Sequence, residues 1–270
     1  MNKIRVLVLL SSIIQFFFYL VNGELDGFID LGFGFDNNTI YWEDQKSFQA
    51  EIIEFSEPTF YAYGKYSMPE HGGTHLDAPY HFWKEGWKIG QIPLNHLISP
   101  GVLVDVSNHV RGNRSFLLTS EHLTEWEQKH RELNQNSKYV MLIKFGWSSK
   151  YDNRSDFLGI GLDEENSKKR SFPGIGASAA NWIVNKGNII GVGVDVASVD
   201  NGASTTYDAH KIFARKNMYN LENVDLSTTK LPAKGFHLIV MPLKSTYGSG
   251  APVRIIASPE SLRNSESTEV

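Results

Sequence analysis

The sequence predicts a mixed α/β fold in which strands outnumber helices. Short apolar runs rich in β-branched or aromatic residues recur along the chain and are typical of strands. Only three segments have the composition and end signals of a helix. The expected strands cover residues 28–31, 60–68, 101–106, 139–144, 189–196, 219–223, 236–243 and 251–256. The expected helices cover residues 121–133, 177–186 and 207–215.

The first of these helices has the clearest end signals. Thr119 or Ser120 can cap its first turn, where Glu121 also lies, and Lys129 lies near its end, so both charges complement the helix dipole. By contrast, residues 148–170 are rich in charged side chains. We expect this segment to form a solvent-exposed loop rather than a binding patch.

Composition indicates an ordinary globular protein and excludes several classes of function. The chain has 270 residues, of which 21% are charged and 41% hydrophobic, which suits one large domain with its own core. A net charge of −4 gives no reason to expect nucleic acid or an anionic membrane as partner. The chain has no cysteine, so disulfides, thiolate catalysis and cysteine-based zinc sites are excluded.

The N-terminus has the pattern of a secretory signal peptide. Lys3 and Arg5 precede an apolar stretch over residues 6–20, and the small residues that follow favour cleavage after Gly23. A retained membrane anchor is the alternative, but the apolar run is short for a full span. We therefore expect a signal peptide over residues 1–23, a single domain over 24–258 and a disordered polar tail over 259–270.

Three acceptor triplets for N-glycosylation agree with a secreted, extracellular protein. They begin at Asn37, Asn113 and Asn153. Such triplets also arise by chance, so they add modest support. We expect no membrane association after the signal peptide is cleaved.

Residues 71–82 hold the densest group of potential metal ligands, with three of the nine histidines and one aspartate. His71 and His75 are spaced for one helical turn, but two glycines and a proline in the segment disfavour a helix. An extended chain fits better, because alternate residues of a strand point to one face. His71, His75, Asp77 and His81 all occupy odd positions and can converge on one point.

These residue types suit a catalytic metal centre. Imidazole and carboxylate are ligands of zinc, and manganese or iron accept them too. The two oxygens of Asp77 can bridge two ions. A divalent ion lowers the pKa of bound water, and His81 has an intrinsic pKa suited to moving the proton. The alternatives are a surface loop that is merely rich in histidine and a structural metal site, which would not need an additional acid or base.

The segment resembles the H-x-G-T-H-x-D-x-P-x-H-F signature of the cyclase family, metal-dependent hydrolases that include bacterial kynurenine formamidase and isatin hydrolase. Every fixed position of the signature is present. The resemblance implies that His71, His75 and Asp77 bind one ion and that Asp77 bridges to a second. It also implies that His81 is the general acid/base.

The resemblance identifies further site residues. A lone histidine on a helix is usually structural, but family members have a histidine and a glutamate–asparagine pair spaced as His210 and Glu222 are here, and both bind the second ion. About two zinc ions per chain are therefore expected, with manganese as the alternative. Trp42 matches a tryptophan that lines the substrate pocket. The proline and glycine that usually follow it are replaced by Glu43 and Asp44, and a role of Trp42 in packing remains the alternative.

The resemblance extends from about residue 29 to 257 and implies a swivelling β/β/α fold that assembles as a homodimer or higher homo-oligomer. It implies a small aromatic amide as substrate. The activity it favours is that of an arylformamidase of tryptophan catabolism, which converts N-formyl-L-kynurenine and water to L-kynurenine and formate through metal-bound hydroxide. A hydrolase of cyclic amides such as isatin, or a secreted binding protein without catalysis, is the alternative.

Overall fold

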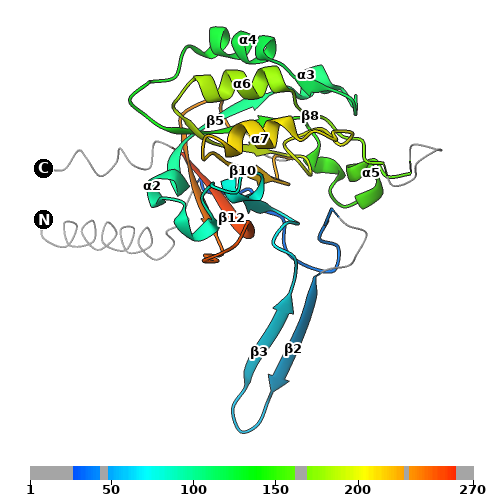
Figure 1. Ribbon diagram of the computed structural model, residues 1–270. Helices are drawn as coiled ribbons and strands as arrows, with labels where there is room; N and C mark the ends of the chain where they lie inside the picture. Colours follow the sequence, from blue (N-terminus) through cyan, green and yellow to red (C-terminus); the bar gives the residue numbers. More distant parts are fainter. Residues whose placement is uncertain (1–26, 43–47, 162–168, 228–230, 260–270) are drawn as a thin grey trace, which may run out of the picture.

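The computed structural model describes residues 27–42, 48–161, 169–227 and 231–259 (Figure 1). The expected signal peptide over residues 1–23 lies outside the described residues, as does the tail from residue 260. Among the helices of the described residues, none has the length and apolar character needed to cross a membrane.

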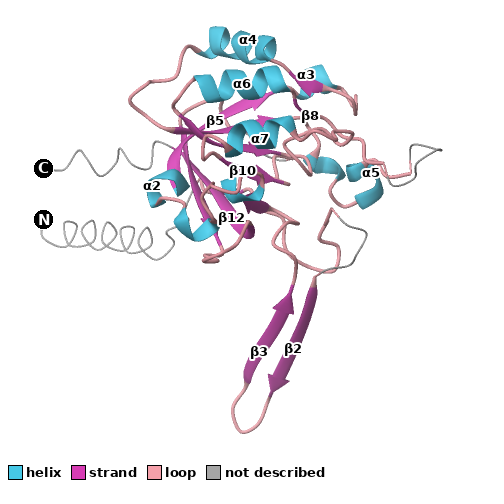
Figure 2. Ribbon diagram, viewed as in Figure 1, coloured by secondary structure: helices cyan, strands magenta, loops and turns pink. Residues whose placement is uncertain are grey.

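An eight-stranded sheet forms the centre of the molecule (Figure 2). Its strands follow the order β1-β12-β11-β5-β7-β9-β10-β4, and β4 pairs again with β12. Seven strands thus close into a barrel-like ring, with β1 beside β12. The strands are β1 (Ile29–Asp30), β4 (His75–Asp77), β5 (Ile98–Asp105), β7 (Tyr139–Lys144), β9 (Ile189–Val194), β10 (Tyr219–Glu222), β11 (Phe236–Pro242) and β12 (Gly250–Pro259).

Strand β4 closes the ring and fixes the position of the histidine-rich segment. Within β4, His75 lies opposite Glu222 of β10 on one side and Pro252 of β12 on the other. Asp77 lies opposite Asn220 and Gly250 in the same way. The ladder hydrogen bonds on both sides of β4 therefore hold the two potential ligands in register.

Helices cover one face of the sheet, where α6 packs against both α4 and α7 (Figure 1). Helix α7 also contacts β10 and the turn after β4. The helices are α2 (Leu94–Leu97), α3 (Ser107–Val110), α4 (Ser120–His130), α5 (Arg154–Leu158), α6 (Ala177–Asn185) and α7 (Asp208–Ala214). Three short 3-10 turns are η1 (Pro79–His81), η2 (Ile89–Gln91) and η3 (Ser148–Lys150). Strands β6 (Leu117–Leu118) and β8 (Gly174–Ile175) form a small separate pair.

Alternating residues of the central strands build two cores. In β7, Met141 and Ile143 pack in the cluster that includes the helices, whereas Val140 and Leu142 pack in the cluster inside the ring. The ring interior is tight. A Cβ added at Gly193 would lie 2.6 Å from the Leu142 side chain, which would have to shift to admit a larger residue. Strands buried on both faces explain why their sequences are apolar throughout rather than alternating.

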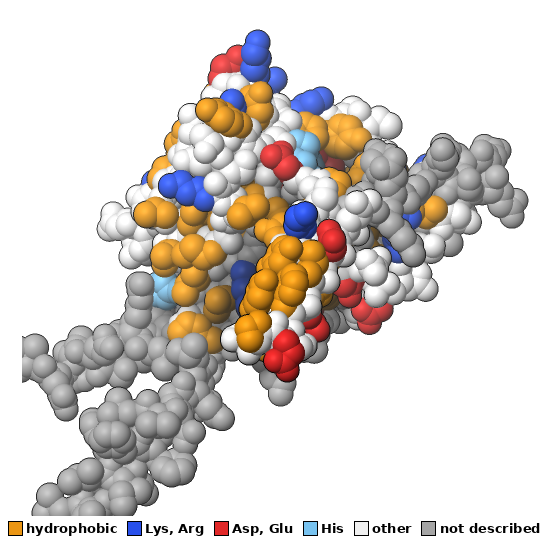
Figure 3. All heavy atoms as spheres, turned by 90° about the horizontal axis from the view of Figure 1, so that it is seen from below, with side chains coloured by type: hydrophobic (Ala, Val, Ile, Leu, Met, Phe, Trp, Pro, Cys, Tyr) orange, Lys and Arg blue, Asp and Glu red, His pale blue; other side chains and the backbone are white. Residues whose placement is uncertain are grey.

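A β-hairpin arm, formed by β2 (Gln49–Phe55) and β3 (Tyr61–Ser67), projects away from the body (Figure 1). Its side chains are largely exposed, including Ile52 at 74%, Phe60 at 64% and Tyr66 at 62%. The rings of Phe55 and Tyr61 stack with centroids 4.6 Å apart. Seen from below, hydrophobic side chains gather in an elongated patch on this side of the molecule (Figure 3).

The expected fold class is confirmed, and most expected elements form within a few residues of their predicted bounds. The expectation of a loop over residues 148–170 is wrong in part. Helix α5 lies within it because Asn153 accepts a hydrogen bond from the amide of Asp156 (3.1 Å) and caps the helix, while Phe157 and Leu158 are buried. Residues 162–168 lie outside the described residues. Strand β2 was not predicted, and β12 continues to Pro259, one residue beyond the expected domain end.

Candidate active site

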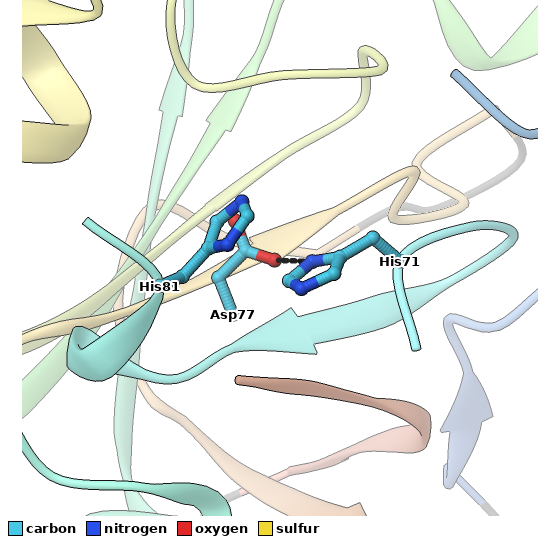
Figure 4. Close-up of side chains that lie close together, drawn as sticks. All are labelled: His71, Asp77 and His81. Atoms are coloured by element: carbon cyan, nitrogen blue, oxygen red, sulfur yellow. Dashed lines mark hydrogen bonds and ion pairs between the residues drawn. The ribbon is translucent and has the colours of Figure 1, made fainter. Parts of the chain in front are cut away.

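The histidine-rich segment is extended only over β4. His75 and Asp77, two residues apart on this strand, project to the same face, whereas Leu76 packs into the ring interior. The prediction that one extended chain presents all four side chains is therefore wrong. His71 precedes the strand, separated from it by Gly73 with φ +57°, and His81 ends the 3-10 turn η1 (Figure 4). Pro79 is tolerated at the first position of η1, because an N–H at that position would have no partner within the turn.

All six residues predicted to act on the metal or the proton are nevertheless brought together. Asp77 Oδ1 lies 2.7 Å from His71 Nδ1 and 3.2 Å from His75 Nε2. Its other oxygen, Oδ2, lies 3.2 Å from His210 Nε2. Glu222 Oε1 is 3.2 Å from His210 Nε2, and Oε2 is 3.5 Å from His75 Nε2. The Asp77 carboxylate thus stands between two groups of ligand atoms.

This geometry fits divalent ions. Two ligand atoms about 2.1 Å from a tetrahedral ion lie roughly 3.4 Å apart, close to most separations in this cluster. The ligand atoms of His75, Asp77 and Glu222 all lie within 4.8 Å of one another, as do those of His71, Asp77 and His81. Both groups contain Asp77, which suits a bridging carboxylate. The division of the five predicted ligands between two ions stays a prediction.

Acceptors outside the cluster hold the far side of the rings. His75 Nδ1 donates to the carbonyl of Gly73 (3.0 Å), and His210 Nδ1 donates to Asp200 Oδ2 (2.6 Å). Asp200 also accepts the amide N–H of His210 (3.1 Å), which ties its carboxylate to α7. Such partners fix the tautomer and orientation of a ligating histidine. For both residues Nε2 is left to face Asp77 and Glu222.

Electrostatics in the metal-free protein indicate a site that attracts positive charge. Burial lowers the pKa of His75, but the hydrogen bond and charge of Asp77 and the charge of Glu222 outweigh it and raise the pKa to about 9. Burial raises the pKa of Asp77, but hydrogen bonds from His210 and His71 hold it well below its usual range. A bound cation would take the place of these protons.

His81 differs from the other histidines of the site. It is the most exposed of the six residues, and its ring stacks on His71 with centroids 3.9 Å apart. Within the described part of the chain, neither ring nitrogen of His81 has a hydrogen-bond partner. Partial burial of the ring, together with the charge on the neighbouring histidines, outweighs the opposing charge of Asp77 and lowers the pKa of His81 to about 4, so the imidazole is neutral near pH 7. A neutral, unheld imidazole at the edge of the cluster is suited to accepting a proton.

A pocket of about 400 Å³ opens beside the cluster. Trp42 lies in its wall and also packs against Phe172 with ring centroids 6.1 Å apart, while its contact with a substrate stays a prediction. The guanidinium of Arg170 lies over the Trp42 ring, 4.2 Å from its centroid. Aromatic and aliphatic groups make up much of the remaining wall, including Ile40, Tyr41, Phe82, Leu158 and Tyr207.

Asp200, Ser249 and Glu70 contact the cluster or its partners but were not predicted as site residues. Asp200 follows β9 and lies ten residues before His210, whereas Ser249 is 178 residues from the histidine it contacts. No spacing in the sequence marks such pairs, because the sheet brings them together. The only local signal is a pair of polar side chains, Ser198 and Asp200, directly after an apolar strand.

Comparison with known proteins agrees with this fold. Residues 29–201 match the family model Cyclase, described as "Putative cyclase". The chain is 30% identical to the isatin hydrolase of Roseibium aggregatum over 77% of its own length and 79% of that protein. It is 29% identical to the kynurenine formamidase of Bacillus cereus, over 86% and 97% of the two chains.

A solved structure of an isatin hydrolase bound to the product analogue thioisatinate has the same fold. Its TM-score is 0.75, with 27% identity, and the match covers 92% of this chain and 97% of that one. The expected cyclase-type fold is thereby confirmed. From the family match and the shared arrangement of strands, the chain belongs to the cyclase family.

Proposed function

We propose that this protein is a metal-dependent hydrolase of an aryl amide, of the arylformamidase type. The reaction is N-formyl-L-kynurenine plus water to L-kynurenine plus formate. The observation that carries the proposal is a buried cluster beside an aromatic pocket. In it His75 and His210 lie against the two oxygens of Asp77, and Glu222 lies against both imidazole rings. The names of the relatives, kynurenine formamidase and isatin hydrolase, support the same class of reaction.

The ligand set consists of five residues, and zinc is the metal proposed for it, with about two ions per chain. A bound divalent ion supplies a Lewis acid for the carbonyl oxygen and lowers the pKa of water. Two of these ligands are held in a fixed orientation, because the Nδ1 atoms of His75 and His210 are bound by Gly73 and Asp200. The ligands are His71, His75, Asp77, His210 and Glu222.

His81 moves the proton. As a neutral base it accepts the proton of the attacking water while the water oxygen bonds to the amide carbon. It then donates the same proton to the leaving nitrogen as the C–N bond breaks, so the imidazole returns to its starting state. Its exposed position at the rim of the pocket gives it access to both groups.

The pocket wall supports a flat aromatic substrate. Trp42, Phe82 and Tyr207 offer ring faces or edges that can pack against an aryl group. One observation favours the second candidate, a neutral cyclic amide such as isatin. Among the described residues that line the pocket none is lysine or arginine, and the Arg170 guanidinium packs over the Trp42 ring in its wall, so the described lining supplies no cation for the amino-acid carboxylate of N-formylkynurenine.

An assay of the zinc-loaded protein against N-formylkynurenine, isatin and a panel of aryl amides and esters tests the proposal. Turnover of N-formylkynurenine with kcat/KM of about 10⁴ M⁻¹s⁻¹ or higher supports the arylformamidase. A hundredfold preference for the cyclic amide would instead support the second candidate, a hydrolase of cyclic amides. No turnover by fully metallated protein contradicts both and favours a binding protein.

We also propose that the mature protein is secreted and N-glycosylated. The side chains of Asn37, Asn113 and Asn153 are all exposed, which supports their use as acceptors. The Oδ1 atoms of Asn113 and Asn153 accept backbone hydrogen bonds, and a glycosylated asparagine keeps that oxygen. The compartment is proposed from the N-terminal sequence alone.

A homodimer or higher homo-oligomer is proposed as the assembly. The β2–β3 arm supports it, because an isolated two-stranded hairpin is marginally stable in water and this one exposes large apolar side chains. Packing against a second copy would cover them.

A further inference from the structure

A chain of hydrogen bonds leads from His71 to the surface. His71 Nε2 and Ser249 Oγ lie 2.9 Å apart, and Ser249 Oγ donates to Glu70 Oε2 at 2.7 Å. The amide N–H of Ser249 donates to the same carboxylate oxygen at 3.0 Å. Since the hydroxyl proton is used by Glu70, the Ser249 oxygen is left to accept the N–H of His71. This arrangement makes Nε2 the protonated nitrogen and leaves Nδ1 to face Asp77.

The segment that carries Ser249 is held from several sides. The Ser249 carbonyl accepts a hydrogen bond from the amide of Ala78 (2.8 Å), next to Asp77 in the chain. The following residue, Gly250, begins β12 and pairs with Asp77. A Cβ added to Gly250 would lie 2.5 Å from His71 Cε1, so the backbone can approach the ring only as glycine. The hydroxyl is thus set against His71 by the same ladder that positions the Asp77 carboxylate.

His71 is the metal-ligand candidate that most needs such support. Its side chain is 26% exposed, whereas those of His75 and His210 are 4% and 5% exposed and are held by Gly73 and Asp200. An exposed imidazole without a partner can rotate about its ring bond and exchange tautomers, which weakens it as a ligand. Ser249 and Glu70 provide for His71 what Gly73 and Asp200 provide for the two buried rings.

We propose that Ser249 and Glu70 are positioning residues of the metal site, with Ser249 orienting His71 and Glu70 orienting the Ser249 hydroxyl. The proposal rests on the proposed function, because it takes His71 as a metal ligand. It predicts an order of effect. Loss of the Ser249 hydroxyl removes the acceptor itself, whereas loss of the Glu70 charge weakens the two hydrogen bonds that orient the hydroxyl and the amide of Ser249.

Metal affinity tests the proposal without relying on catalysis. We expect Ser249→Ala to weaken zinc binding roughly 10–100-fold in competition with a chromophoric chelator, and Glu70→Gln to weaken it less. Ser249→Thr keeps the hydroxyl and should bind close to wild type. Ser107→Ala is the matched control, because Ser107 donates both its N–H and its hydroxyl to Asp105 but lies outside the pocket lining. It should leave zinc affinity unchanged.

A second readout separates orientation from general loss of structure. With cobalt(II) in place of zinc, the visible absorption of Ser249→Ala should change in shape, while the thermal midpoint of the metal-free variant falls no further than that of the control. The double variant Glu70→Gln with Ser249→Ala should bind zinc as weakly as Ser249→Ala alone, because the two residues act in series.

The outcomes are distinguishable. Wild-type affinity and an unchanged cobalt spectrum in Ser249→Ala would overturn the positioning role while leaving the metal site intact. Independent, additive effects of the two substitutions would overturn the series order. A wild-type protein that binds neither zinc nor cobalt would contradict the proposed function itself.

Discussion

At the scale of single residues, the histidines of the site differ in what holds their rings. His75, His210 and His71 each have a partner on the nitrogen that faces away from Asp77. His81 has only a ring-stacking contact with His71 and contacts with Phe82 and His210 among the described residues. A metal-binding histidine needs a fixed tautomer, whereas a histidine that accepts and returns a proton must be able to adopt both the neutral and the protonated form. The contrast supports a separate role for His81.

His81→Ala should therefore lose activity and keep its metal. We expect kcat to fall roughly 10²–10⁴-fold, the usual effect of removing a proton-transfer group. His109→Ala removes an exposed histidine outside the pocket and should behave as wild type. Elemental analysis of both variants checks the assignment, and a parallel loss of metal in His81→Ala would make His81 a ligand instead.

Asp195 is a buried carboxylate that joins the ends of two strands. Its oxygens accept the amide N–H groups of Phe145 (2.7 Å) and Trp147 (2.8 Å), which follow β7, while Asp195 itself follows β9. Burial raises its pKa to about 6, although these N–H groups oppose the shift. Between its usual pKa near 4 and this value, the native state holds a proton that the unfolded chain has released.

The free energy of unfolding should therefore contain a part that decreases as pH rises from about 4 to 6. For a shift of about two pKa units this part amounts to roughly 3 kcal/mol. Asp195→Asn cannot ionise and should show a flatter profile in that window. Urea unfolding of both proteins with excess chelator measures the difference, and coincident pH profiles would contradict the assignment.

At the scale of elements, local patterns predicted the strands of the ring well, because continuous apolar runs identify strands buried on both faces. Of the two strands of the arm, β3 was predicted and β2 was not. Tyr61–Ser67 is rich in tyrosine, whereas Gln49–Phe55 mixes charged and apolar residues, and its pairing to β3 is what makes it a strand. The residues of the site were predicted by their resemblance to the family, and the partners that hold them depend on strand order, which no local pattern contains.

The arm makes the proposed assembly testable. Ile52→Asp together with Phe60→Asp places charges where large apolar side chains are exposed, and we expect the assembly to dissociate in sedimentation velocity experiments. Leu94→Asp is the matched control, since Leu94 is 75% exposed but lies in α2 on the body. A wild type that sediments as a monomer would contradict the proposed assembly. Arm variants that stay assembled would contradict the role of the arm in it.

At the scale of the whole molecule, we propose from the pattern of the N-terminal sequence that the protein enters the secretory pathway. Expression of the full chain in a secreting eukaryotic cell should release protein into the medium with an N-terminus near Glu24. Glycosidase treatment should lower its mass, and Asn37→Gln, Asn113→Gln and Asn153→Gln combined should abolish that change. Retention in the cell with Met1 intact would contradict the assignment.

Metal content and activity measured on the same samples test the central claim most directly. Asp77 lies between both groups of ligand atoms, so Asp77→Asn should lose the ions of both. Gently purified wild type should contain about two divalent ions per chain. Chelation should abolish amide hydrolysis, and added zinc should restore it in the wild type but not in Asp77→Asn. A wild type that hydrolyses the amide equally well with and without metal, or an Asp77→Asn variant that keeps both ions, would contradict the account.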